Sequence, residues 1–126
     1  KLVMDAYNAN PASMRASLEA FIEEFKSRAK TLVLGDMKEL GPDSPRFHRE
    51  LGEWLAGLDL KAVYLVGPEM RAAQAALLAA KPRFPVSHAP AAKDFAPALK
   101  GKLAARDAVL FKGSRAMRLE DLAKEI

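Results

Sequence analysis

Residues 2–11 read LVMDAYNANP and combine a strand, a polar loop and the start of a helix. The apolar run at residues 2–4 ends in the carboxylate of Asp5. Pro11 favours a helix start, because proline suits the first helical position and Asn10 suits the cap before it. In an open α/β sheet, ligands bind outside the carboxyl ends of the strands. The residues between this strand and this helix are therefore candidate ligand contacts.

The alternation of strand and helix continues along the chain. Hydrophobic periodicity predicts strands at residues 2–5, 31–34, 62–66, 86–88 and 108–111. It predicts helices at residues 11–28, 45–58, 69–80 and 91–103, and a final helix carrying Leu119, Leu122 and Ile126. Such alternation favours right-handed βαβ units and a mostly parallel sheet. We therefore expect one doubly wound α/β domain over residues 1–126, with five or six strands and helices on both faces.

Prolines and aliphatic runs refine this prediction. Ser44 suits the cap of the second helix, and Pro45 suits its first position. Pro97 lies inside the fourth helical pattern, so that helix is expected to be kinked or to start late. The strands are nearly continuous aliphatic runs, which is typical of strands buried on both faces.

The composition is that of an ordinary globular chain, with 50% hydrophobic and 29% charged residues. The net charge of +4 comes from 20 basic and 16 acidic residues spread along the chain. This modest excess suits phosphate-bearing small molecules, and no basic run interleaved with aromatic residues supports a nucleic-acid surface. The apolar runs are too short to cross a bilayer. The absence of cysteine excludes disulfides and fits a reducing compartment.

Polar residues follow the predicted strands. Asp5 could merely cap a turn, but an ionised carboxylate there could also accept both hydroxyls of a ribose. The sequence KGSR at residues 112–115 offers two cations and a hydroxyl, which suits either a bound phosphate or carboxylate or a solvated helix start. His48 and His88 lack partners at metal-ligand spacing, so no metal site is expected.

Three common catalytic or nucleotide-binding motifs are absent from the sequence. It contains no G-x-G-x-x-G fingerprint, no G-x-x-x-x-G-K-[ST] phosphate-binding loop and no G-x-S-x-G nucleophile elbow. The chain is therefore expected to help bind a charged ligand without carrying a complete catalytic site.

Three motifs, taken in order, resemble the C-terminal domain of the Mur ligase family. They are DAYNANPASM at residues 5–14, LGDMKELG at residues 34–41 with His48 after it, and LFKGSRAM at residues 110–117. The resemblance covers nearly the whole chain and implies the Rossmann-like fold of that domain. It is closest to the branch of the family that adds D-alanyl-D-alanine to UDP-N-acetylmuramoyl-tripeptide.

The resemblance implies a parent enzyme that uses ATP and Mg²⁺ to form an amide bond in peptidoglycan synthesis. In that family, ATP phosphorylates the terminal carboxylate of the UDP-linked tripeptide, and the amine of D-alanyl-D-alanine attacks the acyl phosphate. The phosphate-binding loop and the Mg²⁺ ligands lie in a central domain that is missing here, and Lys1 stands directly at a strand, as in a piece of a longer protein. The parent is expected to be a cytoplasmic monomer in which this domain closes over ATP, and the fragment to fold alone without ligase activity.

The motif positions also imply roles for individual residues on the nucleotide side. Asp5 would hold the ATP ribose. The other expected nucleotide contacts are Tyr7, Asn8 and Asn10.

On the acceptor side, the resemblance assigns Lys112, Ser114 and Arg115 to the dipeptide or the acyl phosphate, with Lys112 as the candidate catalytic residue. Asp36 and Glu39 would shape the dipeptide pocket from the loop after the second strand.

Two alternatives stay open at this point. Asp5 and Lys112 resemble the acidic pocket and lysine of a signalling receiver, but such a site also needs an aspartate after the third strand, where this chain has Val66, Gly67 and Pro68. A sister ligase such as folylpolyglutamate synthase shares the domain architecture. The strings YNANP and KGSR argue against that ligase.

Overall fold

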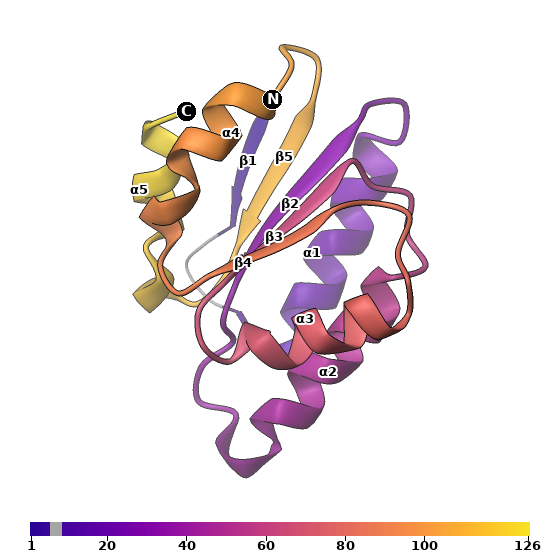
Figure 1. The fold of residues 1–126 in the computed structure, drawn as a ribbon, viewed down its shortest axis with the longest axis vertical. Helices are drawn as coiled ribbons and strands as arrows, with labels where there is room; N and C mark the ends of the chain where they lie inside the picture. Colours follow the sequence, from indigo (N-terminus) through magenta and orange to yellow (C-terminus); the bar gives the residue numbers. More distant parts are fainter. Residues whose placement is uncertain (6–8) are drawn as a thin grey trace.

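The computed structural model describes residues 1–5 and 9–126, and the strands in this part of the chain form one parallel sheet in the order β1-β5-β2-β3-β4 (Figure 1). The strands are β1 (Leu2–Asp5), β2 (Lys30–Gly35), β3 (Ala62–Val66), β4 (Val86–Ala89) and β5 (Ala108–Lys112). All five lie where hydrophobic periodicity predicts them, with ends that differ by at most one residue.

Helices cover both faces of the sheet, as Figure 1 shows. One face carries α1 (Pro11–Glu24), α2 (Ser44–Leu55) and α3 (Met70–Ala79), and the other carries α4 (Ala96–Lys102) and α5 (Leu119–Lys124). Short 3₁₀ turns precede three of these helices: η1 (Gly41–Asp43), η2 (Ala92–Phe95) and η3 (Arg115–Met117). The doubly wound α/β prediction is confirmed. Within the described residues, no helix combines the length and apolar character needed to cross a bilayer.

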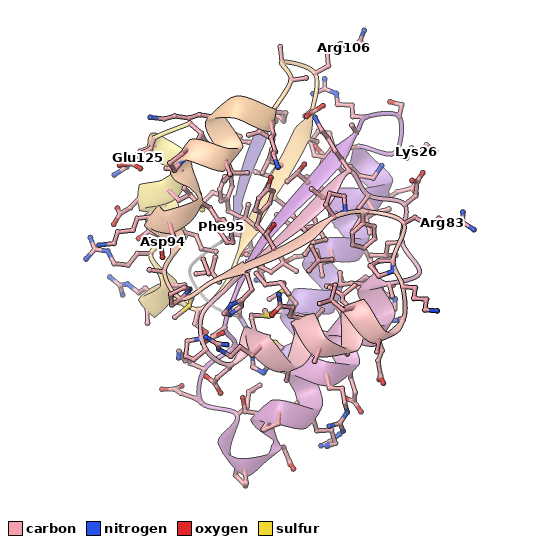
Figure 2. The ribbon with its side chains drawn as sticks, in the orientation of Figure 1. Lys26, Arg83, Asp94, Phe95, Arg106 and Glu125 are labelled. Carbon is pink, nitrogen blue, oxygen red and sulfur yellow. The ribbon has the colours of Figure 1, made fainter. Side chains whose placement is uncertain are left out.

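Two hydrophobic cores lie on the two sides of the sheet. Leu32 and Leu34 of β2 belong to the core beneath α1, α2 and α3, whereas Val33 between them belongs to the core beneath α4 and α5. On the second side, Phe95 lies against the sheet (Figure 2), where its ring meets the Tyr64 ring edge-on at a centroid distance of 5.0 Å. Alternate residues of one strand thus pack into the two cores on opposite sides of the sheet.

Burial on both faces holds for the three middle strands but not for the whole sheet. Every residue of β2, β3 and β5 is buried, whereas β1 and β4 contain exposed and half-buried positions. Leu2 and Met4 of β1 are 45% and 42% exposed. The expectation of full burial is therefore wrong for β1 and β4, because each occupies an edge of the sheet and has a neighbouring strand on one side only.

The last strand, β5, lies between the first two strands of the chain, and this position defines a ligand crevice by topology. The chain leaves β1 and β2 toward the face with α1 and α2, but it leaves β5 toward the opposite face with α5. Neighbouring strands whose connections diverge in this way form a switch point, where α/β proteins bind ligands beyond the strand ends. The ends of β1, β5 and β2 therefore define the candidate site.

The predicted bounds of α1 and α2 are partly wrong, and α2 ends at Leu55 rather than at residue 58. α1 ends at Glu24 rather than near Arg28, because the chain has to turn into β2 there. The ammonium of Lys30 donates to the Arg28 carbonyl at 3.0 Å and thereby satisfies an oxygen in that turn. At α2, Asp43 occupies the cap position and Ser44 is already helical, because η1 tightens the chain just before it.

The region around Pro97 divides into two pieces, as the proline suggests. η2 comes first, and α4 then begins at Ala96, with Pro97 in its first turn, where a missing N–H costs nothing. The final helix, α5, carries Leu119 and Leu122 as predicted but ends at Lys124, before Ile126. η3 precedes it, and Arg118 between them takes a left-handed conformation.

Candidate functional site

The first pair of site residues joins the carboxyl ends of β1 and β5. Asp5 and Lys112 are register partners in the parallel β1–β5 ladder. The Lys112 ammonium lies 3.0 Å from Oδ2 of Asp5, and the hydroxyl of Ser17 on α1 donates to the same oxygen at 2.5 Å. Lys112 is only 2% exposed, whereas the Asp5 side chain is 41% exposed. The site therefore presents a carboxylate to solvent and keeps the opposite charge beneath it.

The surroundings of Asp5 keep its carboxyl ionised. Partial burial alone would raise the pKa of Asp5, since it removes water from the charged form. The hydrogen bond from Ser17 and the neighbouring charge of Lys112 outweigh that effect and hold the pKa below the usual range for aspartate. At neutral pH this carboxylate is thus a permanent acceptor of hydrogen bonds.

Two glycines allow the loops after β2 and β5 to touch. A Cβ atom added to Gly113 would lie 2.8 Å from the Cα of Gly35, and a Cβ added to Gly35 would lie 2.6 Å from the Met117 side chain. Hydrogen bonds continue this contact beyond the strands. The Ser114 N–H donates to the Asp36 carbonyl at 3.1 Å, and the Lys38 N–H donates to Oγ of Ser114 at 2.9 Å. The predicted residues Asp36 and Ser114 therefore do come together.

The carboxylate of Asp36 faces the N-terminus of α3. It is completely buried and accepts hydrogen bonds from the N–H groups of Met70 at 2.8 Å and Glu69 at 3.1 Å. These N–H groups would otherwise lack partners in the helix, and the helix dipole favours a negative charge there. Gly67 leaves the space for this contact, since a Cβ on it would overlap the Asp36 carboxyl group. Asp36 thus fastens the loop after β2 to α3.

Lys38 and Glu69 form a half-buried continuation of this cluster. The Lys38 ammonium lies 3.3 Å from Asp36 and 3.3 Å from Glu69. Desolvation alone would lower the pKa of Lys38, but the two carboxylates outweigh it and raise that pKa. Desolvation alone would raise the pKa of Glu69, but hydrogen bonds from Ser44 and Lys38 lower it. Lys38 and Glu69 are therefore both charged at neutral pH.

A cavity of about 400 Å³ opens at the same edge of the sheet, between the loop after β4 and the start of α5. Its apolar walls include Val66, Met117 and Leu122. Charged residues of both signs line it as well: Lys93, Arg118, Asp121 and Glu125. Figure 2 shows Glu125 on the outer side of α5. Small apolar walls with mixed charges suit a small zwitterionic molecule.

A family model described as Mur ligase, glutamate ligase domain, matches residues 1–115 of this chain. The chain belongs to the Mur ligase family. Its strand order also separates it from the receiver-like alternative, because the flavodoxin-like order 2-1-3-4-5 places β1 inside the sheet. In this Mur ligase domain β1 is an edge strand.

Relatives and solved structures agree with this family. The UDP-N-acetylmuramoyl-tripeptide–D-alanyl-D-alanine ligase of Bacillus subtilis is 34% identical over 99% of this chain and 27% of its own length. The ligase of the same name from Treponema pallidum is 36% identical over 95% of this chain and 26% of its own length. The Mur ligase domain thus spans about a quarter of the curated relatives it matches.

Two solved structures have the same fold over nearly the whole chain. One is the MurF ligase from Thermotoga maritima in complex with ADP, which is 32% identical with a TM-score of 0.69 and covers 98% of this chain and 27% of its own. The other is MurF from Acinetobacter baumannii, which is 29% identical with a TM-score of 0.78 and covers 98% of this chain and 28% of its own. The expected domain fold is confirmed.

Other predicted site residues of the Mur ligase domain have different surroundings. The Asn10 side chain caps α1 by accepting a hydrogen bond from the Ser13 N–H at 2.9 Å. Glu39 is exposed and has a positive φ of 63°, and Arg115 is exposed at the start of η3. Tyr7 and Asn8 lie outside the described residues. The ligand contacts expected of all these residues stay predictions.

The sequence alone does not identify Ser17, Lys38 or Glu69 as members of the cluster. Ser17 lies on a helix whose pattern indicates only a buried apolar face, and its distance from Asp5 in the sequence gives no sign of contact. Glu69 could have been found, because it follows the end of β3 and therefore shares the carboxyl edge. In the part of the chain that the structure describes, no cluster of three or more histidine, aspartate or glutamate side chains could hold a metal ion.

Proposed function

We propose that the parent of this domain is an ATP-dependent ligase that joins D-alanyl-D-alanine to UDP-N-acetylmuramoyl-tripeptide. The names of the Bacillus subtilis and Treponema pallidum relatives support these substrates, and the ADP complex of the Thermotoga maritima enzyme supports the nucleotide. The reaction would convert ATP, a carboxylate and an amine into ADP, phosphate and an amide. This domain would supply one half of the site and the central domain of the parent the other half.

The observation that carries this proposal is the ionised, part-exposed carboxylate of Asp5 at the switch point of the sheet. Its described contacts, from Ser17 and Lys112, both involve Oδ2 and leave 41% of the side chain exposed. A carboxylate held in this way can accept hydrogen bonds from the two hydroxyls of a ribose. We therefore assign the ATP ribose to Asp5, with Tyr7, Asn8 and Asn10 next to the nucleotide. ATP would supply the phosphoryl group that activates the tripeptide carboxylate.

For the acceptor, we propose that D-alanyl-D-alanine enters next to the loop after β5. Ser114 and Arg115 follow Gly113 after β5, and Asp36 and Glu39 belong to the neighbouring loop. The cavity of about 400 Å³ adjoins the same loop and combines small apolar walls with charges of both signs. A dipeptide with two methyl side chains, an ammonium and a carboxylate matches that chemistry.

Lys112 is the proposed catalytic residue, and its position suggests a definite electrostatic role. Its ammonium is almost completely buried and lies against Asp5. A cation held at this edge would stabilise negative charge that develops there during the reaction, such as the charge of a phosphorylated carboxylate. It would do so without moving, because the β5 strand holds its backbone within the sheet.

Several further properties of the parent remain proposals. Mg²⁺ would be held by the central domain, since the described residues offer no cluster for it. The fragment alone would fold but lack ligase activity, because its sequence has no phosphate-binding loop. We also propose that the parent is a cytoplasmic monomer.

A coupled assay on the full-length parent tests the function. ADP release should require UDP-N-acetylmuramoyl-tripeptide and D-alanyl-D-alanine together, and the product should be the UDP-linked pentapeptide by mass spectrometry. ADP release with another acceptor, such as glutamate, and none with D-alanyl-D-alanine would overturn the proposal. The Asp5→Ala variant of the same protein should need a much higher ATP concentration for half-maximal rate.

A further inference from the structure

The imidazole of His48 on α2 is completely buried and bonded at both ring nitrogens. Its exposed fraction is 0%. The backbone N–H of Met37 donates to Nε2 at 3.0 Å, and Nδ1 lies 2.8 Å from the carbonyl oxygen of Ser44. A carbonyl oxygen can only accept, so Nδ1 carries the proton, and Nε2 has to be unprotonated to receive the N–H of Met37. Two backbone groups thus fix a neutral imidazole in one tautomer.

The residue that His48 binds is the middle one of three consecutive loop residues, each held by a different element. Asp36 is held by the first N–H groups of α3, and Lys38 is held through its N–H by Oγ of Ser114 after β5. Met37, between them, is held by His48 of α2. The loop after β2 therefore takes its shape from three separate parts of the fold. The contact with His48 is the link to α2.

We propose that His48 is a positioning residue for the acceptor side of the site. Its unprotonated Nε2 fixes the Met37 N–H, and this fixes the neighbouring Lys38 N–H on the hydroxyl of Ser114. His48 would not touch a substrate, because it is completely buried. The kinetic consequence of this inference rests on the proposed ligase function, whereas its structural consequence does not.

Two amide substitutions separate the two bonds of the ring. In His48→Gln, the side-chain oxygen can replace Nε2 as acceptor for Met37, but the donor to Ser44 is lost. In His48→Asn, the side-chain nitrogen can replace Nδ1 as donor to Ser44, but the acceptor for Met37 is lost. Both variants introduce a buried amide and should lose comparable stability, so each serves as the control for the other.

The experiment measures amide hydrogen exchange by mass spectrometry in the full-length parent, for the peptide that covers residues 36–41. An unsatisfied buried N–H weakens its segment, so this peptide should exchange about tenfold faster in His48→Asn and at nearly the wild-type rate in His48→Gln. In the ligase assay, the KM for D-alanyl-D-alanine should rise about tenfold in His48→Asn only. The KM for ATP should stay within about twofold in both variants.

Equal exchange rates in the two variants would overturn the inference, as would an effect of His48→Asn on melting temperature alone. If neither variant folds, two-dimensional ¹⁵N NMR of the wild-type imidazole decides, since a protonated Nε2 at neutral pH would exclude the proposed bond. A parent that does not ligate D-alanyl-D-alanine would overturn the proposed function, and the exchange measurement would still test the role of His48.

Discussion

The ammonium of Lys112 lies 3.0 Å from the carboxylate of Asp5, across the parallel β1–β5 pair. The two partners differ in exposure, because the Lys112 side chain is 3% exposed and the Asp5 side chain 41%. The buried ammonium of Lys112 is held in place by β5, and the exposed carboxylate of Asp5 can still accept hydrogen bonds from a ligand. The pair therefore leaves an ionised carboxylate open to a ligand.

Replacing Asp5 by asparagine should weaken nucleotide binding more than it weakens the fold. The amide preserves the shape and can still accept the bond from Ser17, but it removes the charge that a ribose would meet. We expect the KM for ATP of the full-length parent to rise at least about tenfold, the value of one charge-assisted hydrogen bond. Ser17→Ala is the control, since it retains the charge and should change the KM for ATP much less. An unchanged KM in Asp5→Asn would exclude the ribose contact.

Acid should destabilise the domain partly through Asp107. Its carboxylate lies near Lys61 and accepts a hydrogen bond from the Ala104 N–H at 3.0 Å. Burial alone would raise its pKa, but Lys61 and this N–H outweigh burial and lower the pKa below the usual value of 3.8. A lowered pKa in the folded state stabilises the fold above 3.8, and this contribution is lost as the pH falls through the folded-state pKa.

Asp107→Asn should therefore remove part of the pH dependence of unfolding below the usual aspartate pKa. Urea denaturation of wild type and variant across the acid range measures this difference. The two free energies of unfolding should differ by about 1–3 kcal/mol at neutral pH and converge in strong acid. A difference that stays constant with pH would show that the charge of Asp107 does not contribute.

A methyl group at Gly67 should disturb the connection between β3 and α3. Gly67 has a φ of +107°, a conformation that other residues rarely adopt, and an added Cβ would overlap the Asp36 carboxyl group. We expect Gly67→Ala to lower the free energy of unfolding by about 2–4 kcal/mol. Gly57→Ala is the matched control, because an added Cβ there would meet only the Trp54 carbonyl oxygen, at 3.8 Å. Equal stability of the two variants in urea denaturation would contradict the predicted overlap.

Filling the cavity next to α5 should affect the acceptor rather than the nucleotide. Ala116 lines this cavity and is exposed, so Ala116→Trp can occupy the space without disrupting a core. In the full-length parent, we expect the KM for D-alanyl-D-alanine to rise about tenfold, the loss of roughly 1.4 kcal/mol of binding. The KM for ATP should not change. The control is Ala79→Trp at the exposed end of α3, and the same KM for the dipeptide in both variants would place the acceptor elsewhere.

Much of the architecture could be predicted because it depends on local sequence patterns. The aliphatic run of β3 predicts a buried strand, and the glycine after it predicts where that strand ends. Asn10 and Pro11 predict the start of α1. Parallel strands place their carboxyl ends at one edge, so the meeting of Asp36 with Ser114 follows from the fold class. These predictions need only periodicity and capping.

The remaining features depend on contacts between distant parts of the chain. Nothing near residue 108 indicates that β5 inserts between β1 and β2, and this insertion is what pairs Lys112 with Asp5. The orientation of Asp36 toward α3 needs Gly67, which lies far away in the sequence. The sequence around His48 does not indicate the tautomer of its ring, because the two ring nitrogens bond to backbone groups that only the fold brings close.

The position of β5 also has a consequence for how the domain is made. A ribosome delivers β1 first and β5 last, so β1 has no neighbour to pair with until residues 108–112 have emerged. In the folded sheet β5 pairs with both β1 and β2, so the backbone groups of those two strands that face β5 have no ladder partner before β5 is made. Nascent chains with such open edges are prone to wrong pairing and aggregation. Synthesis of this domain therefore passes through a vulnerable interval that ends only when its last strand enters the middle of the sheet.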